Sequence, residues 1–277
     1  MITLIVAFGN LALGAAYAGL GLLSAWEAIS LHRYRGWSRF GVGFSLMAAS
    51  CGPHHFAHGW HILQGESVAW PMFATTLIGL PAGLIFLWLR GEAMWGGRGE
   101  RWLTVSPDRA VLLVTGFGLM CGWLAACAYT QVASNLLLSQ CTSTAESSTA
   151  AGAGIDFTSV TFLANVFVTG TYGMVGWYLG DRQVRRYLTS GNWSLSGVAL
   201  TGVFFTCAQM HLIDATTNGS DLMLVFDLIG IPASIYFLRV VKQLHNDSVM
   251  DWNRRPLVGA ATAPARPSPW SGEAAHS

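Results

Sequence analysis

Long apolar stretches alternate with short polar segments along almost the whole chain. Each stretch is long enough to cross the roughly 30 Å hydrocarbon core of a bilayer as an α-helix. In lipid, a helix also satisfies its backbone hydrogen bonds within its own segment. The pattern therefore predicts an all-α integral membrane protein with seven transmembrane helices, at residues 3–30, 40–63, 69–89, 109–137, 157–180, 194–215 and 220–241.

The positive charges mark one side of this expected bundle. All 15 Lys and Arg residues follow the first, third, fifth or seventh helix, at 33–39, 90–109, 182–186 and 239–266. The other three connections between helices carry none. Because positive charge is retained on the cytoplasmic side of a membrane, the pattern places the N-terminus outside and the C-terminus inside.

One arrangement of polar residues occurs twice. In each copy an Asn precedes a Tyr by seven residues, the Tyr precedes a Cys by 34 or 35, and the Cys precedes a His by four. The copies are Asn10, Tyr17, Cys51 and His55, then Asn165, Tyr172, Cys207 and His211. An internal repeat of this kind indicates two structural units of the same design.

The repeat divides the chain into segments. We expect a first three-helix repeat at 1–92, a linker with the fourth helix at 93–155, a second three-helix repeat at 156–245 and a disordered cytoplasmic tail at 246–277. The single helix between the repeats restores the chain direction, so both repeats cross the membrane in the same sense. The prediction is a parallel 3+1+3 internal repeat, with the second helix of one unit near the second helix of the other.

Composition supports the membrane class. The chain of 277 residues is 52% hydrophobic and 10% charged, whereas a soluble domain has about 25% charged residues. A net charge of +1 gives no basic surface for nucleic acid. We therefore expect the lipid bilayer as the partner of this surface, in a bacterial cytoplasmic (inner) membrane, and no nucleic-acid partner.

The candidate chemistry lies in the second helix of each repeat. Helix 40–63 holds a cysteine and a run of histidines, which are Cys51, His54, His55, His58 and His61. Helix 194–215 holds Cys207, His211 and Asp214 at corresponding positions. Ionisable side chains in a spanning helix are costly unless they are paired or face a cavity, so each is a functional candidate. The alternative is packing, because a buried cysteine often serves as a small apolar residue.

A thiol and an imidazole one helical turn apart predict a metal site. Thiolate and imidazole ligands, with methionines nearby, suit Cu(I). Zn(II) also accepts Cys and His, and Asp214 makes the second copy more favourable for zinc. A third alternative is haem held by histidines on facing helices, such as His55 or His58 with His211.

Each repeat resembles the ethylene-binding transmembrane domain of ethylene receptors and related bacterial sensor kinases. The matching residues are Tyr17, Cys51, Gly52 and His55 in the first copy, and Tyr172, Cys207 and His211 in the second. In that family the Cys and the His bind Cu(I), and the copper holds the ethylene. The family domain works as a dimer, and this chain resembles such a dimer fused into one polypeptide.

The resemblance implies a role for each matching residue. Cys51 with His55 would form one Cu(I) site and Cys207 with His211 its twin, in a pocket lined by Asn10, Tyr17, Asn165 and Tyr172. Three departures bear on this role. The family has an acid in its first helix where this chain has an Asn, the second copy has Ala208 where the family has Gly, and the family's cytosolic signalling modules do not follow here.

The function favoured by these residues is Cu(I) binding, for copper handling or for copper-dependent sensing of a small ligand. His54, His58, His61 and Asp214 would then be further metal-binding groups towards the outer side, and sensing would require a signalling partner in the cytoplasm or the membrane. Two alternatives stay open, a 3+1+3 transporter of a small solute or metal and a bis-His haem redox protein. A non-enzymatic role is favoured, because the sequence singles out no catalytic set.

Overall fold

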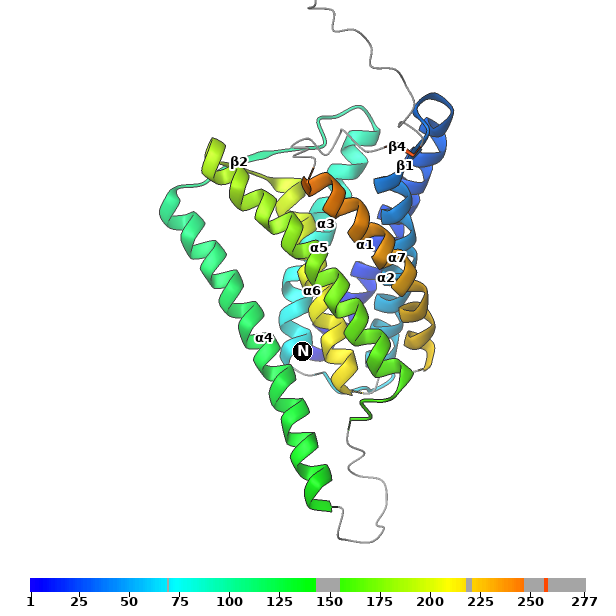
Figure 1. Ribbon diagram of the computed structural model, residues 1–277, viewed down its shortest axis with the longest axis vertical. Helices are drawn as coiled ribbons and strands as arrows, with labels where there is room; N and C mark the ends of the chain where they lie inside the picture. The colour runs from blue at the N-terminus through cyan, green and yellow to red at the C-terminus, as the bar shows by residue number, and fades with distance from the viewer. Residues whose placement is uncertain (69, 143–154, 218–220, 247–256, 259–277) are drawn as a thin grey trace, which may run out of the picture.

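Seven long helices form a bundle in the computed structural model, which describes residues 1–68, 70–142, 155–217, 221–246 and 257–258 (Figure 1). The helices are α1 (Ile2–Arg35), α2 (Arg39–Leu63), α3 (Trp70–Met94), α4 (Pro107–Thr142), α5 (Val160–Ser190), α6 (Leu195–Thr217) and α7 (Asp221–Asn246). Each predicted helical segment is present, and each helix is longer than expected. Two short antiparallel strand pairs join loops at one end, β1 (Trp37–Ser38) with β4 (Leu257–Val258) and β2 (Trp102–Thr104) with β3 (Asn192–Ser194).

Local sequence signals define the start of α2 and both ends of α5. Ser38 is the N-cap of α2, and its hydroxyl accepts a hydrogen bond from the Gly41 amide at 3.0 Å. Ser159 caps α5 in the same way and accepts from the Phe162 amide at 3.1 Å. Gly191 ends α5 with a φ of 67°, a left-handed conformation that favours glycine. These caps fix the register of two helices that carry residues of the candidate site.

The helix contacts occur in matching pairs. In what we call the first group, α1 packs against α2 and α3, and in the second group α5 packs against α6 and α7. Between the groups, α3 contacts α6 and α2 contacts α7. Side chains of α2 and α6 also meet across the centre, where His54 and His58 contact Asp214. The sequence-based expectation that these two helices face one another is therefore confirmed.

An aromatic layer fills the bundle on one side of its middle. Phe204 and Phe237 stack with ring centroids 5.4 Å apart, and Phe44 meets Phe237 edge-on at 5.8 Å. Phe40 extends this layer towards the end that carries β1, with its ring 5.2 Å from that of Phe237. The layer separates the charged loops at that end from the polar residues at mid-length.

Five helices of the described chain are long and apolar enough to cross a membrane, namely α1, α3, α4, α6 and α7. α2 and α5 are not among them. Large apolar side chains cover the outside, including Leu22 and Trp177, which are 73% and 67% exposed. Soluble monomers rarely expose apolar patches on this scale, so the surface suits a lipid bilayer.

α4 stands apart from the bundle over much of its length (Figure 1). Phe117 packs edge-on against Phe205 of α6, with ring centroids 5.4 Å apart. Of the residues in its apolar segment Pro107–Cys127, few are buried, as expected for a linker helix that lies in lipid. Residues 143–154 of the predicted linker lie outside the described residues, as does the predicted tail apart from Asn246 and β4.

Candidate metal centre

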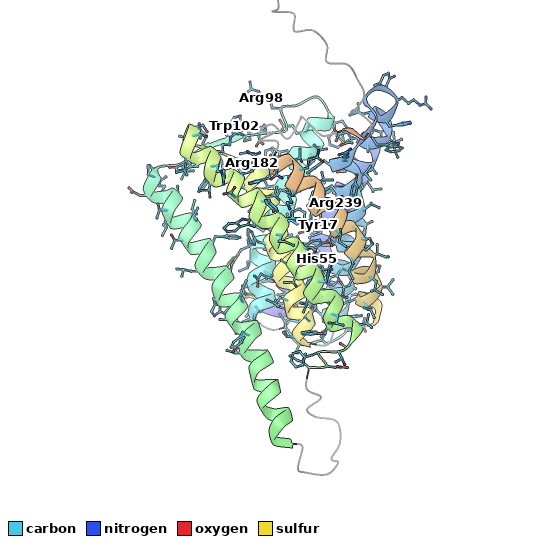
Figure 2. All side chains as sticks on the ribbon, viewed as in Figure 1. Tyr17, His55, Arg98, Trp102, Arg182 and Arg239 are labelled. Carbon is cyan, nitrogen blue, oxygen red and sulfur yellow. The ribbon has the colours of Figure 1, made fainter. Side chains whose placement is uncertain are left out.

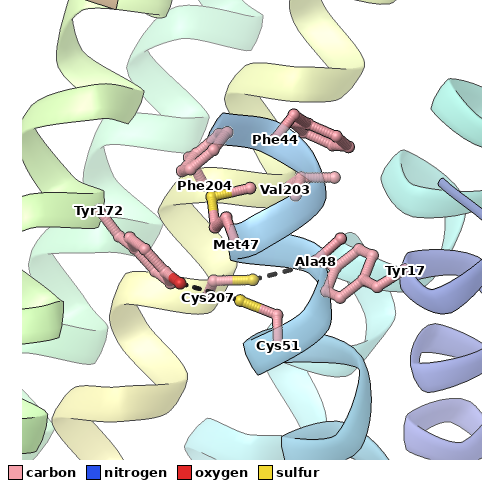
Figure 3. A pocket seen from close by; sticks show the side chains of 9 residues that line it. All are labelled: Tyr17, Phe44, Met47, Ala48, Cys51, Tyr172, Val203, Phe204 and Cys207. Carbon is pink, nitrogen blue, oxygen red and sulfur yellow. Dashed lines mark hydrogen bonds between the residues drawn. The ribbon is translucent and has the colours of Figure 1, made fainter. Parts of the chain in front are cut away.

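Two cysteines and two tyrosines meet in the middle of the bundle, and all four are buried. The Cys51 sulfur lies 3.0 Å from the Tyr172 hydroxyl, and the Cys207 sulfur lies 3.3 Å from the Tyr17 hydroxyl (Figure 3). Each tyrosine therefore contacts the cysteine of the other group. This crossed arrangement brings the two copies of the motif into one centre.

The two cysteines share a small cavity, which we call the cysteine cavity. Its lining consists of Tyr17, Phe44, Met47, Ala48, Cys51, Tyr172, Val203, Phe204 and Cys207 (Figure 3). Its volume is about 10 Å³, close to the least space that holds one water molecule. Both cysteines are free thiols. With Met47, the lining offers three sulfur-containing side chains, which are soft donors.

An asparagine orients one histidine in each group. His55 Nδ1 lies 2.7 Å from Asn10 Oδ1, and His211 Nδ1 lies 2.8 Å from Asn165 Oδ1. The amide orientation follows from the other contacts, because each Asn Nδ2 donates to the backbone carbonyl four residues earlier. An amide oxygen only accepts, so a neutral imidazole at either position carries its proton on Nδ1 and a free lone pair on Nε2. Histidines that bind metals are oriented in this way.

The same histidines lie against the tyrosines of the cysteine cavity. Ring centroids are 5.1 Å apart for Tyr17 and His55, and 5.6 Å apart for Tyr172 and His211, both edge-on. Cys51 also has His211 of the second group among its neighbours. The repeated Asn, Tyr, Cys and His residues thus form one connected centre. The spacing in the sequence does not say whether the two copies form one shared site or two separate ones.

Two buried carboxylates adjoin this centre. Asp214 Oδ2 lies 2.9 Å from Nε2 of both His54 and His58. Asp227 Oδ1, from α7, lies 3.0 Å from His54 Nδ1 and 3.3 Å from His211 Nδ1. We call these five residues the His–Asp network. His54 links its two carboxylates, and His211 connects it to the cysteine cavity.

The two groups differ beside their asparagines. Asn165 Nδ2 donates to Asp227 Oδ2 at 2.8 Å. At the matching place, Asn10 Nδ2 lies 3.4 Å from the Thr76 hydroxyl. The second group therefore has a buried negative charge where the first has a neutral hydroxyl, so the centre is asymmetric in charge.

The structure brings together all but one of the site residues expected from the sequence. Those in the buried centre are Asn10, Tyr17, Cys51, His54, His55, His58, Asn165, Tyr172, Cys207, His211 and Asp214. His61 lies apart, with its side chain 27% exposed and its Nδ1 3.9 Å from a Glu66 carboxylate oxygen. Asp227 also belongs to the centre. As a lone carboxylate within an apolar helix it is costly unless paired. From the sequence it is a candidate proton or cation carrier or a partner of His211, whose Nδ1 lies 3.3 Å from its Oδ1.

No protein-family model, curated protein or solved structure matches this chain. The chemistry of the centre therefore follows from its own donors. Sulfur atoms line the cysteine cavity, whereas imidazole nitrogens and carboxylate oxygens make up the His–Asp network. Soft and harder donors are thus separated within one buried region.

Proposed function

We propose that this protein binds one Cu(I) ion at the cysteine cavity, for copper handling or for sensing a small ligand held by copper. The observation that carries the proposal is that Cys51 and Cys207, from different groups, line the same cavity. Thiolates are the ligands that best suit Cu(I). A cavity of about 10 Å³ has room for an ion and not for a porphyrin, which favours a metal ion over haem.

The surrounding residues fit this donor set. Met47 adds a thioether to the lining. His55 and His211 keep Nε2 free for a ligand role because their Nδ1 atoms donate to asparagines. The Tyr17 and Tyr172 hydroxyls contact the sulfurs, so they hold the thiols in position. Bound copper would supply a soft, electron-rich centre to which a small unsaturated ligand can bind.

The proposal includes a membrane topology. All seven helices would cross the bilayer as a parallel 3+1+3 repeat, with the N-terminus outside and α2 and α5 shielded by their neighbours. The matching helix contacts of the two groups support the repeat. Arg98 and Arg182 lie towards the end that carries β2, and Tyr17 and His55 lie nearer mid-length (Figure 2). With that end in the cytoplasm, the copper site would lie within the membrane.

Metal analysis of the full chain, purified in mild detergent under reducing conditions and supplied with Cu(I), tests the proposal. We expect one copper per chain, and loss of most of it in both Cys51→Ser and Cys207→Ser. Cys121→Ser is the matched control, because Cys121 lies in α4 outside the cavity lining. Full copper content in the double cysteine variant would refute the proposal. Two coppers per chain, each lost with one cysteine, would replace the shared site by two separate ones.

A further inference from the structure

A second set of donor atoms lies within the His–Asp network and includes no sulfur. His54 Nε2 and His58 Nε2 each lie 2.9 Å from Asp214 Oδ2, and all three side chains are buried. The two histidines are four residues apart on α2, so they project from one face of that helix towards α6. One ligand atom from each of the three residues lies within 4.8 Å of the others.

These separations are close to those of a metal site. In a tetrahedral zinc site with bonds of about 2.1 Å, neighbouring ligand atoms are about 3.4 Å apart. The observed 2.9 Å contacts require outward movements of roughly half an ångström to accept an ion, which side-chain rotation supplies. Two His and one Asp are also a usual set of three protein ligands for a transition metal, with a further position left for water.

A buried carboxylate contacts the far ring nitrogen of one of these histidines. His54 Nδ1 lies 3.0 Å from Asp227 Oδ1, so Asp227 can hold the His54 ring with Nε2 directed at the ion. Carboxylates orient metal-binding histidines in this manner. His58 Nδ1 is buried without a hydrogen-bond partner in the described chain. The three atoms His54 Nε2, His58 Nε2 and Asp214 Oδ2 converge within reach of one ion, and this convergence favours a set of ligands.

The charges also favour a divalent ion. Asp214 and Asp227 are 2% and 0% exposed, and their contacts described above are to histidines and an asparagine. Buried carboxylates within a membrane protein require compensating positive charge. One divalent cation, held by the imidazoles as neutral ligands, would balance both carboxylates. The nitrogen and oxygen donors of this set separate it from the sulfur donors of the cysteine cavity, which suit Cu(I).

We propose that His54, His58 and Asp214 form a second metal site, for a transition-metal dication such as Zn²⁺, distinct from the cysteine cavity. The ion would arrive from the end of α2 that ends at Leu63. His61 lies there, three residues beyond His58, with a side chain 27% exposed and next to Glu66, which is 48% exposed.

Titration of the full chain in detergent with Zn²⁺, and with Co²⁺ as a spectroscopic probe, tests the site. The wild-type chain and the Cys51→Ser, Cys207→Ser double variant are expected to bind one equivalent of Zn²⁺ equally well. His58→Gln and Asp214→Asn should each weaken binding at least tenfold while leaving Cu(I) content unchanged. His61→Ala is the control on the same helix and should retain the affinity. Ligand-field bands of bound Co²⁺ should appear without a thiolate charge-transfer band.

Several outcomes would overturn the site. One is no Zn²⁺ uptake by the wild-type chain, and another is unchanged affinity in both His58→Gln and Asp214→Asn. Loss of Zn²⁺ in the double cysteine variant would assign the ion to the sulfurs, and loss only in His61→Ala would indicate a surface ion. If the two ligand variants do not fold, the Co²⁺ spectrum of the double cysteine variant decides, because absence of ligand-field bands there excludes the site. Cu(I) content is measured separately, so either proposal can fail alone.

Discussion

The charge asymmetry between the two asparagines can be tested by making the same substitution in both groups. Asn10→Asp and Asn165→Asp each replace a buried amide by a carboxylate that faces Nδ1 of a histidine. The cost of burying the new charge and its attraction to the histidine are therefore similar in the two variants. What differs is the neighbour of the former Nδ2 atom, which is the Thr76 hydroxyl at 3.4 Å in one case and Asp227 Oδ2 at 2.8 Å in the other.

The size of the difference follows from Coulomb's law. Two unit charges 2.8 Å apart repel by about 6 kcal/mol at an effective dielectric constant of about 20. Asn165→Asp also removes a hydrogen bond to a carboxylate, worth about 1.5–3 kcal/mol. The two carboxylates at positions 165 and 227 can share a proton, which limits the total loss of stability. We therefore expect Asn165→Asp to be less stable than Asn10→Asp by several kcal/mol. For a chain of this size that corresponds to a melting temperature lower by about 10 °C or more.

Thermal unfolding followed by far-ultraviolet circular dichroism, in one detergent and at one pH, measures this difference. The double variant Asn165→Asp, Asp227→Asn provides the rescue. Its new amide at position 227 can donate to the new carboxylate at position 165, so we expect most of the lost stability to return. Equal melting temperatures for Asn10→Asp and Asn165→Asp, or a double variant no more stable than Asn165→Asp, would show that the Asn165–Asp227 contact is not formed.

Two other predictions concern packing and charge away from the centre. A β-carbon on Gly14 would lie 3.0 Å from the backbone oxygen of Gly52, so Gly14→Ala should destabilise the chain by about 1–3 kcal/mol in thermal unfolding. Gly170→Ala, whose β-carbon meets no atom of the described chain within 4 Å, should be neutral or stabilising by up to about 1 kcal/mol. Equal losses of stability in the two variants would refute the close approach of Gly14 to the Gly52 backbone. Arg90 donates to Glu27 where both side chains are largely buried, and a double-mutant cycle with Arg90→Ala and Glu27→Ala should give a coupling of about 1–2 kcal/mol, whereas zero coupling would contradict it.

The sequence predicts the helices well because their signal is local. Apolar stretches of membrane length appear directly in the order of residues. The repeat can also be read directly from the sequence, because equal spacing shows that Cys51 and Cys207 occupy corresponding positions in the two copies. Helix ends are less predictable, because a segment defined by its apolar residues ends at the first charged residues even where the helix continues. α5 continues to Ser190, ten residues beyond its expected end, because Arg182 donates to the Leu244 and His245 carbonyls and Arg185 pairs with Asp181.

The partners of the site residues could not be read from spacing. A repeat indicates which residues correspond to each other, but not which ones touch. Spacing does not say which tyrosine lies beside Cys51, and the hydroxyl at 3.0 Å is that of Tyr172, from the other group. This crossing depends on how α2 and α6 meet across the bundle, which is a property of long-range packing. Asp227 could be recognised from the sequence as costly in its helix and as a candidate partner of His211, which it contacts at 3.3 Å. Its shorter contact with His54 could not be predicted, because it depends on the same long-range packing.

The position of Asp227 also links the two proposed sites. Its Oδ1 atom lies 3.0 Å from Nδ1 of His54, a ligand of the proposed second metal site. The same atom lies 3.3 Å from Nδ1 of His211, which neighbours Cys51 of the cysteine cavity. A dication on His54 would draw electron density from this carboxylate and weaken its hold on the His211 ring. The affinity of the cysteine cavity for Cu(I) would then depend on the dication. Because such coupling is reciprocal, Cu(I) would change the affinity for the dication by the same factor, and both effects would pass through Asp227.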